Sequence, residues 1–247
     1  MVVAGADSSA RAGIAADQEA IEAQGLDMRG VVSVWTRQDA GGVQSFSPLE
    51  ATTWEAEALG LLDQDPAALK LGLLPGVEHL EAAARLSVLA LERGIHVILD
   101  PVLRSSSGFE FLNGEGVRAL RARLLVQRLV VTPNLLEAPA LCAEKSGLEG
   151  LGELHRRRAL GDRILAQGAQ AVLLKGGHGA EDPVQDLILE RDQEIHWHAH
   201  PRLQGRSLGG SGCRYASSVA AALGAGLSLR EAASLAGDYV LRRMLPS

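Results

Sequence analysis

The chain has 247 residues, and 47% of them are hydrophobic, which is enough apolar material for one sizeable core. Its formal net charge is −6 and it has no block of Lys or Arg, so it lacks the electrostatic signature of a protein that binds nucleic acid or an anionic membrane. The two cysteines, Cys142 and Cys213, are far apart and lack CxxC spacing, which argues against a disulfide framework or a thiolate zinc site.

The chain begins with an aliphatic run at Val2–Gly5 that has neither a charged leader nor a long apolar segment, and no later run approaches the length of a membrane span. No linker or low-complexity stretch divides the sequence. We therefore expect a cytoplasmic protein without membrane or nucleic-acid partners, folded as a single domain over residues 1–247.

Short aliphatic runs alternate with longer amphipathic patterns along the chain. Strands are expected, in order, at Val31–Trp35, Leu69–Leu74, His96–Asp100, Leu129–Thr132 and Ala171–Lys175. Helices are expected at Ile14–Gln24, Glu50–Leu62 and Val77–Arg93. The second helix should start with Ser47 as N-cap, Pro48 in the first turn and Glu50 as capping-box carboxylate, and the third should end at Gly94.

This alternation predicts right-handed crossovers and an α/β fold with a mostly parallel sheet covered by helices on both faces. Gly42–Pro48 and Asp186–His200 instead alternate apolar and polar residues, so we expect antiparallel pieces at a sheet edge or in a small lid. Ligands of such sheets bind beyond the carboxyl ends of the strands. The loops to inspect therefore follow Ala4, Gln38, Leu74, Asp100, Thr132 and Lys175.

Three glycines open a helix of small residues within Ser207–Gly226. Gly209, Gly210 and Gly212 lack Cβ atoms, so a phosphate can approach backbone amides at a helix N-terminus with its positive dipole. The same dipole would lower the thiol pKa of Cys213 and make it a base or a polar anchor for a substrate hydroxyl. Taken alone, Cys213 is better explained as a small buried residue that packs the helix onto the sheet.

The segment Gly210–Cys213, Gly-Ser-Gly-Cys, resembles the signature of hydroxymethylpyrimidine and phosphomethylpyrimidine kinases of the ribokinase-like superfamily. Further matches follow in the same order over nearly the whole chain: Ala4–Ser8, Ala12–Asp17, Gln38, Lys70–Leu74, Leu99–Leu103, Val131–Glu137 and Val172–His178. The resemblance implies a ribokinase-like fold and a homodimer. It also implies ATP- and Mg²⁺-dependent phosphorylation of 4-amino-5-hydroxymethyl-2-methylpyrimidine and of its monophosphate in thiamine biosynthesis.

The resemblance assigns roles at the site of phosphoryl transfer. Cys213 falls at the position of the base, and the amides of Gly210, Ser211 and Gly212 would stabilise charge on the transferred group. Contacts to ATP phosphates are implied for a carboxylate and two residues at strand ends, namely Asp100, Lys175 and Gly176. Closure of the edge segment from Gly41 to Pro48 would exclude water.

Substrate and metal roles follow from the same resemblance. Asp17 and Gln38 would recognise the aminopyrimidine, with Leu73 and Val102 as apolar lining. Asn134 and Glu137 would order Mg²⁺, largely through water. From the pattern alone, Asn134 and Glu137 are explained equally well as a plain helix cap. On the same basis Asp17 would be an exposed helix position and Lys175 a solvated lysine.

Several positions depart from the family pattern: Ser8–Arg11 replaces Pro-x-Gly-Gly, Gly209 replaces a histidine and Arg214 replaces a threonine. They motivate one alternative, a catalytically weak module that binds nucleotide or pyrimidine. A second alternative is a pyridoxal kinase, which shares the superfamily fold and also phosphorylates a hydroxymethyl group on a nitrogen heterocycle, although Gln38 and Cys213 favour the pyrimidine. A P-loop NTPase and a dinucleotide-binding Rossmann enzyme are disfavoured because GxxxxGK[ST] is missing and no GxGxxG follows the first strand.

Three histidines, His196, His198 and His200, alternate and would share one face of a strand, with Ile195 and Trp197 directed toward the body of the protein. A transition-metal site is one hypothesis for them. A polar outward face is the favoured interpretation, because no added carboxylate or thiolate accompanies the histidines.

Overall fold

A computed structural model describes the chain except for residues 40–41, 143–146, 206–207 and 246–247. The described strands form one sheet in the order β3-β2-β1-β4-β5-β6-β7-β8-β9. In chain order these are β1 Val2–Asp7, β2 Gly30–Asp39, β3 Gly42–Pro48, β4 Ala68–Leu71, β5 His96–Leu99, β6 Val130–Val131, β7 Ala171–Leu174, β8 Val184–Glu190 and β9 His196–His200. The six central strands, β2-β1-β4-β5-β6-β7, run parallel.

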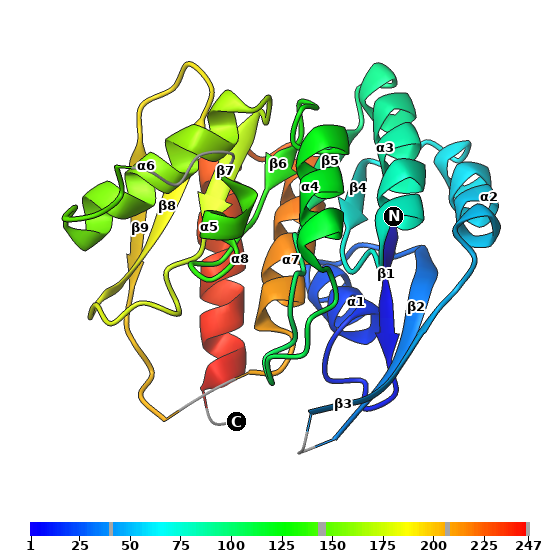
Figure 1. Cartoon of the computed structure of the whole chain (residues 1–247), viewed down its shortest axis with the longest axis horizontal. Helices are drawn as coiled ribbons and strands as arrows, with labels where there is room; N and C mark the ends of the chain where they lie inside the picture. The colour runs from blue at the N-terminus through cyan, green and yellow to red at the C-terminus, as the bar shows by residue number, and fades with distance from the viewer. Residues whose placement is uncertain (40–41, 143–146, 206–207, 246–247) are drawn as a thin grey trace.

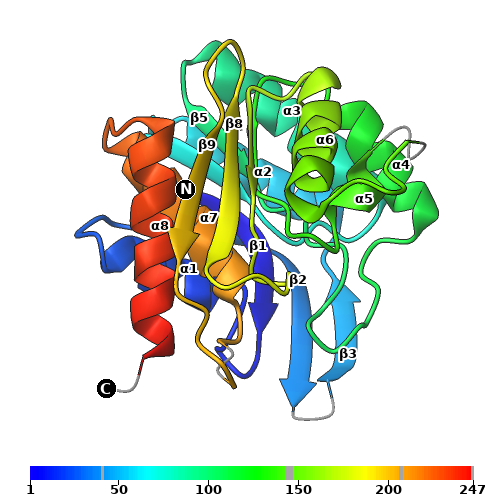
Figure 2. The same cartoon turned by 90° about the vertical axis from the view of Figure 1, so that its left-hand side faces the viewer.

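Helices cover both faces of the sheet, as Figures 1 and 2 show. One face carries α2 Ala51–Leu62, α3 Val77–Glu92, α4 Gly114–Arg123, α5 Ala138–Leu141 and α6 Glu153–Ala166. The other carries α1 Ile14–Glu22, α7 Ser211–Gly224 and α8 Leu229–Met244. The predicted α/β architecture with a mostly parallel sheet is confirmed.

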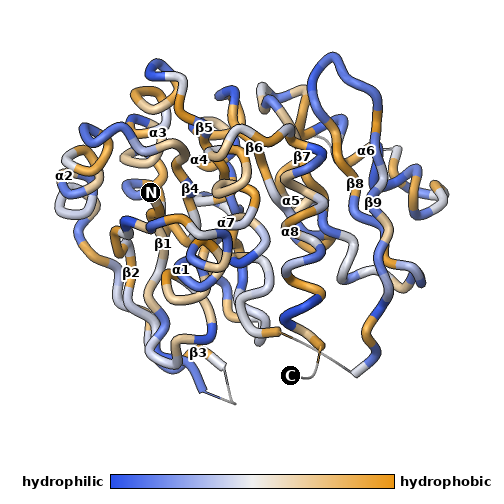
Figure 3. Tube along the Cα trace, turned by 180° about the vertical axis from the view of Figure 1, so that it is seen from behind, coloured by the Kyte–Doolittle hydropathy of each residue, from blue (hydrophilic) through white to orange (hydrophobic). Residues whose placement is uncertain are grey.

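The core has two main layers because neighbouring residues of a strand point to opposite faces. Leu69 and Leu99 pack with the α2–α6 layer, whereas Ala68 and Ile98 pack with α7 and α8. Hydrophobic residues follow the central strands, while the turn between β8 and β9 is hydrophilic (Figure 3). The strands are therefore buried on both sides. Among the described residues, no helix is long and apolar enough to cross a membrane.

The antiparallel segments are confirmed at the two sheet edges. At one edge β3 pairs antiparallel with β2, and at the other β8 pairs antiparallel with β7 and β9. Phe46 of β3 contacts Phe109 and Phe111, with ring centroids 5.8 and 5.5 Å away, so the β2–β3 hairpin is anchored to the loop after β5. Gly41, which begins the segment expected to close over the site, lies outside the described residues.

The predicted start of α2 is wrong. Ser47 and Pro48 belong to β3, where they pair with Trp35 and Val34, and Glu50 is the N-cap without a side-chain hydrogen bond. A proline is tolerated there because β3 is an edge strand. The end of α3 matches the prediction, since Gly94 adopts the left-handed conformation with φ 74° directly after the C-cap Arg93.

Candidate active site

A cavity of about 990 Å³ opens at the carboxyl ends of the parallel strands. Its lining comes from β1, from the segments that follow β4, β5, β6 and β7, and from the start of α7. A parallel sheet places all of these strand ends along one edge, which is where we expected a ligand to bind. Most of the residues singled out from the sequence line this cavity: Gln38, Leu73, Asp100, Val102, Asn134, Glu137, Lys175, Gly210, Ser211, Gly212 and Cys213.

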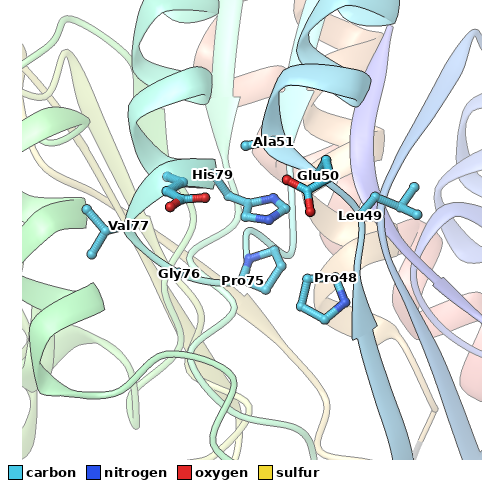
Figure 4. Close-up of a pocket in the computed structure, with 9 residues that line it drawn as sticks. Pro48, Leu49, Glu50, Ala51, Pro75, Gly76, Val77 and His79 are labelled. Carbon is cyan, nitrogen blue, oxygen red and sulfur yellow. The ribbon is translucent and has the colours of Figure 1, made fainter.

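A second hollow, of about 340 Å³, lies between the starts of α2 and α3 (Figure 4). Its charged residues, Glu50 and Glu78, are carboxylates, which repel a phosphate. Its one histidine, His79, already accepts a hydrogen bond at Nδ1 from Trp54 Nε1 at 2.9 Å. The chemistry of phosphate binding therefore points to the larger cavity.

The glycine loop before α7 exposes backbone amides to the cavity. Gly210 is the N-cap of α7 in the left-handed conformation with φ 69°, and a Cβ there would lie 2.6 Å from the carbonyl oxygen of Arg11. Ser211 donates its amide to the Leu208 carbonyl at 3.1 Å. Within the described part of the chain, the amides of Gly210 and Gly212 have no hydrogen-bond partner, so these two remain available to an anion.

Cys213 lies in the first turn of α7, beside this loop, but its predicted thiolate is wrong. Burial raises the pKa of Cys213 to about 12, with Asp17 and Asp100 adding to the shift and Lys70 opposing it. Burial disfavours the charged thiolate, and neither Lys70 nor the backbone hydrogen bond from Gly13 offsets it. At neutral pH Cys213 is a protonated thiol that can hydrogen-bond a substrate hydroxyl.

Asp17 is buried beneath the cavity rather than exposed on its helix. Its carboxylate is 2.9 Å from Lys70 Nζ and accepts a hydrogen bond from Ser217 Oγ at 2.8 Å. Lys70 is fully buried and contributes to the cavity lining. Burial alone would lower the pKa of Lys70, but Asp17, Cys213 and Asp100 raise it above its usual value, so the ammonium stays charged.

A second cation, Lys175, stands at the end of β7. Its Nζ donates to Asp100 Oδ1 at 3.2 Å, and a Cβ on Gly212 would lie 3.3 Å from the same Nζ. Burial acts to lower the pKa of Lys175, but Asp100 and Glu137 outweigh it and raise the pKa. The lysine is therefore held in an ion pair rather than free in solvent, and its charge lies beside the glycine loop.

Asn134 and Glu137 form a reciprocal cap at the turn after β6. Asn134 Oδ1 accepts the amides of Leu136 and Glu137 at 2.8 and 3.0 Å, and Glu137 Oε2 accepts the amide of Asn134 at 2.8 Å. Burial raises the pKa of Glu137 to about 7, with Asp100 adding to the shift and Lys175 opposing it. The reciprocal hydrogen bonds of the predicted cap are present, but they close the turn before α5, whose N-cap is Glu137, and both side chains still line the cavity.

Gly176 holds the loop after β7 through its amide, which donates to Asp186 Oδ1 at 2.6 Å. A Cβ at this glycine would lie 2.1 Å from the Gln185 carbonyl oxygen, so the close approach of β8 requires glycine. Its neighbours Gly177 and His178 line the cavity instead. The amide of Gly176 is thus committed to the protein.

The histidines of β9 do not assemble a metal centre. Asp186 Oδ2 is 3.5 Å from His200 Nε2, and the rings of His198 and His200 are 6.0 Å apart. Throughout the described residues, no group of three or more His, Cys, Asp or Glu side chains is arranged to hold a metal ion. Trp197 and Ile195 pack against the core, as expected.

Another part of the cavity lining is apolar and carries one side-chain amide, that of Gln38. Leu73 packs with Val34 and Phe111, and Val102 joins this cluster. Gln38 Nε2 is 3.4 Å from Thr36 Oγ1, and both residues line the cavity. A flat heterocycle with polar edges would find both apolar contact and a hydrogen-bonding amide here.

Two residues of the site were missed as functional candidates. Lys70 was considered only within Lys70–Leu74, one of the segments that resemble the kinase family. A lysine between the aliphatic residues Leu69 and Leu71 nevertheless indicates a buried, paired charge. Arg214 was noted only as a departure, yet its side chain bonds the backbone of the glycine loop. No local pattern around Arg214 indicates that contact.

The family model for phosphomethylpyrimidine kinase matches residues 7–245. A hydroxymethylpyrimidine/phosphomethylpyrimidine kinase of Streptomyces coelicolor is 35% identical over 97% of this chain and 86% of its own length, and one of Rhizobium meliloti is 34% identical over 96% and 87%.

Solved structures show the same fold. A phosphomethylpyrimidine kinase of Clostridium difficile superposes with a TM-score of 0.82 at 24% identity, covering 99% of this chain and 98% of that one. A pyridoxal kinase of Staphylococcus aureus in complex with ADP superposes with a TM-score of 0.86 at 28% identity, covering 98% and 86%. With a family match over nearly its whole length and relatives above 30% identity, the chain belongs to the phosphomethylpyrimidine kinase family.

Proposed function

We propose that this protein transfers the γ-phosphoryl group of ATP to the hydroxymethyl oxygen of 4-amino-5-hydroxymethyl-2-methylpyrimidine, and then a second phosphoryl group to the resulting monophosphate. The observation that carries the proposal is the meeting of Lys175, Asp100 and the free amide of Gly212 beside the Cys213 thiol at one end of the cavity. Catalysis of phosphoryl transfer needs positioning and charge neutralisation, which these groups supply.

Mg²⁺ fits the residues at this end of the cavity. Asp100 and Glu137 offer hard oxygen ligands, and both lie close enough to Lys175 to affect its pKa. Asn134 Oδ1 is occupied by two amides, so its contribution to a hydrated cation would pass through water. When bound, the metal would neutralise phosphate charge and align the nucleotide.

Residues of the chain itself would neutralise charge on the phosphate and orient the attacking hydroxyl. Lys175 would neutralise charge on the γ-phosphate, and the amides of Gly210 and Gly212 would stabilise it during transfer. The substrate oxygen would form the new bond to the γ-phosphorus while the bond from that phosphorus to the β–γ bridging oxygen breaks, and this oxygen leaves with ADP. The hydroxyl proton would pass to an oxygen of the transferred phosphoryl group and from there to solvent. Cys213, held as a thiol, would orient the attacking hydroxyl by a hydrogen bond.

Pyrimidine recognition would rest on Gln38 and on the apolar walls at Leu73 and Val102. Asp17 would act from below, because its carboxylate holds Lys70 in the cavity floor. We also propose that the protein acts as a cytoplasmic homodimer with one domain per chain.

A pyridoxal kinase is the second candidate, favoured by the structural match to the Staphylococcus aureus enzyme. Pyridoxal also presents a hydroxymethyl group on a nitrogen heterocycle, so the same cavity chemistry applies. A third candidate is a module that binds nucleotide without turnover. The departures from the family pattern at Ser8–Arg11 and Gly209 favour it.

The test offers the protein ATP and Mg²⁺ with the pyrimidine, its monophosphate or pyridoxal and identifies products by mass spectrometry. Mono- and diphosphate of the pyrimidine are expected, with a large loss in Cys213→Ala and after chelation of the metal. Phosphorylated pyridoxal alone would move the assignment to the second candidate. Nucleotide binding without any product would indicate the binding module.

A further inference from the structure

Arg214 ties together two backbone segments that border the cavity. Its Nη1 donates to the carbonyl oxygens of Gly209 at 2.5 Å and Arg11 at 3.1 Å. Only 5% of the residue is exposed, and it lies behind the glycine loop, outside the cavity lining. One guanidinium therefore joins the loop before α1 to the loop before α7.

The carbonyl contacts fix the direction of the following amides. In a trans peptide the C=O of one residue and the N–H of the next point in opposite directions in one plane. Because Arg214 holds the Gly209 carbonyl from behind, the Gly210 N–H is turned toward the cavity that Gly210 lines. The Arg11 carbonyl fixes the Ala12 amide in the same way, and Ala12 also lines the cavity.

The guanidinium is itself anchored by Glu19 of α1. Glu19 Oε2 accepts from Arg214 Nη2 at 2.5 Å and from Nε at 3.1 Å. Arg243 Nε lies 2.5 Å from Glu19 Oε1, and Tyr239 donates to the same oxygen at 3.2 Å. The two α8 residues thus hold Glu19 without touching either loop carbonyl.

We propose that Arg214 is a positioning residue for phosphoryl transfer, which aims the Gly210 amide at the transferred group by holding the Gly209 and Arg11 carbonyls behind the loop. The inference rests on the proposed function for its kinetic consequence. Its geometric part, the orientation of an anion-binding amide, also applies to bound nucleotide alone.

Arg214→Met removes all of these bonds, and Arg214→Lys keeps a charge near Glu19 but cannot bridge the same acceptors. Arg243→Met is the matched control, because it removes a partner of the same Glu19 and leaves the loop contacts in place. Each variant is checked for folding by thermal melting, then assayed for kcat, KM and affinity for a non-hydrolysable ATP analogue. If Arg214→Met fails to fold, Arg214→Lys carries the comparison.

Both Arg214 variants should lower kcat by roughly 10- to 100-fold, as expected for a misplaced oxyanion donor, while the KM of the pyrimidine changes by less than about twofold. Affinity for a non-hydrolysable ATP analogue, which keeps the γ-phosphoryl group, should fall in both, and Arg243→Met should stay within about twofold of the unmodified protein in every readout. The proposal is overturned if the Arg214 variants and Arg243→Met behave alike. If the unmodified protein turns over no pyrimidine, the proposed function fails and the comparison of affinities for the ATP analogue alone decides the role of Arg214.

Discussion

Lys70 and Asp17 form an ion pair with 2.9 Å between Nζ and Oδ1, and both side chains are completely buried beneath the cavity. Ser217 Oγ adds a hydrogen bond to the same carboxylate oxygen at 2.8 Å. A lysine in a β-strand between two leucines is stable in the core only because this carboxylate pairs with it. The pair places a fixed positive charge in the floor of the cavity.

Removing one partner of this pair should strongly destabilise the fold. Lys70→Met leaves the Asp17 charge buried without its cation, so we expect a loss of about 3–5 kcal/mol in the free energy of unfolding. Chemical denaturation monitored by circular dichroism measures it.

Lys70→Met combined with Asp17→Asn should recover part of that loss, because no lone charge remains in the core. Arg85→Met is the control: its partner is Glu55, the Arg85 side chain is 59% exposed, and the change should cost less than about 1 kcal/mol. Equal costs for Lys70→Met and Arg85→Met would contradict the assignment of a buried pair.

The Cys213 thiol should resist alkylation at neutral pH. Its pKa is raised to about 12 by burial, so the thiolate fraction grows only in strongly alkaline solution. The rate of iodoacetamide labelling of Cys213, followed by mass spectrometry, should still be rising at pH 10. A plateau reached by pH 8 would show a low-pKa thiolate instead.

Substitution of Cys213 offers a second readout. Cys213→Ser retains a group that can hydrogen-bond a substrate hydroxyl, so it should keep more kcat than Cys213→Ala. Identical losses in the two variants would show that hydrogen bonding at this position is unimportant.

Two neighbouring glycines should respond differently to alanine. Gly210→Ala places a Cβ 2.6 Å from the Arg11 carbonyl oxygen and 2.8 Å from Ala12 Cα, at a φ of 69°. We expect a loss of about 1–3 kcal/mol in unfolding free energy and a loss of kcat. At Gly209 the nearest atom would be 3.5 Å away, so Gly209→Ala should be tolerated. Thermal melting and kcat measured for both variants check this, and equal effects would contradict the loop geometry.

Much of the architecture could be predicted because it depends on local patterns. Aliphatic runs such as Val97–Leu99 can satisfy burial only in a sheet that is covered on both faces, and Gly94 marks a helix end by its left-handed conformation. The glycines before Cys213 likewise indicated the start of a helix, and α7 begins at Ser211. The predicted start of α2 was wrong because a Ser-Pro pair suits both a helix cap and the end of an edge strand.

The electrostatics of the site could not be predicted because they depend on long-range contacts. Cys213 has a raised pKa since the fold buries it among Asp17 and Asp100, which are distant in sequence. From the helix pattern alone Asp17 would be exposed, because that helix gives no sign that Lys70 lies beneath it. Arg214 meets Glu19 across 195 residues, so no local pattern signalled its bond to the glycine loop.

Glu137 should make the ligand-free protein less stable as pH rises. Burial raises its folded-state pKa to about 7 from an ordinary value of 4.5. A raised carboxyl pKa means that the stabilising contribution is complete below about pH 4.5 and is lost as pH rises through about 7. The loss amounts to at most about 3 kcal/mol.

The difference in unfolding free energy between Glu137→Gln and the unmodified protein isolates this effect. Denaturation curves from pH 5 to 8 should show the variant gaining relative stability with rising pH, because glutamine cannot ionise. A constant difference across that range would show that Glu137 titrates with an ordinary pKa.

The most direct test of the proposed activity compares kcat/KM for the hydroxymethylpyrimidine, its monophosphate and pyridoxal under the same ATP and Mg²⁺ concentrations. The account predicts that both pyrimidines are phosphorylated with kcat/KM at least about tenfold above that of pyridoxal, since under the proposal Gln38 and the apolar walls would contact the heterocycle in the transition state. A kcat/KM for pyridoxal that exceeds the values for both pyrimidines would contradict it.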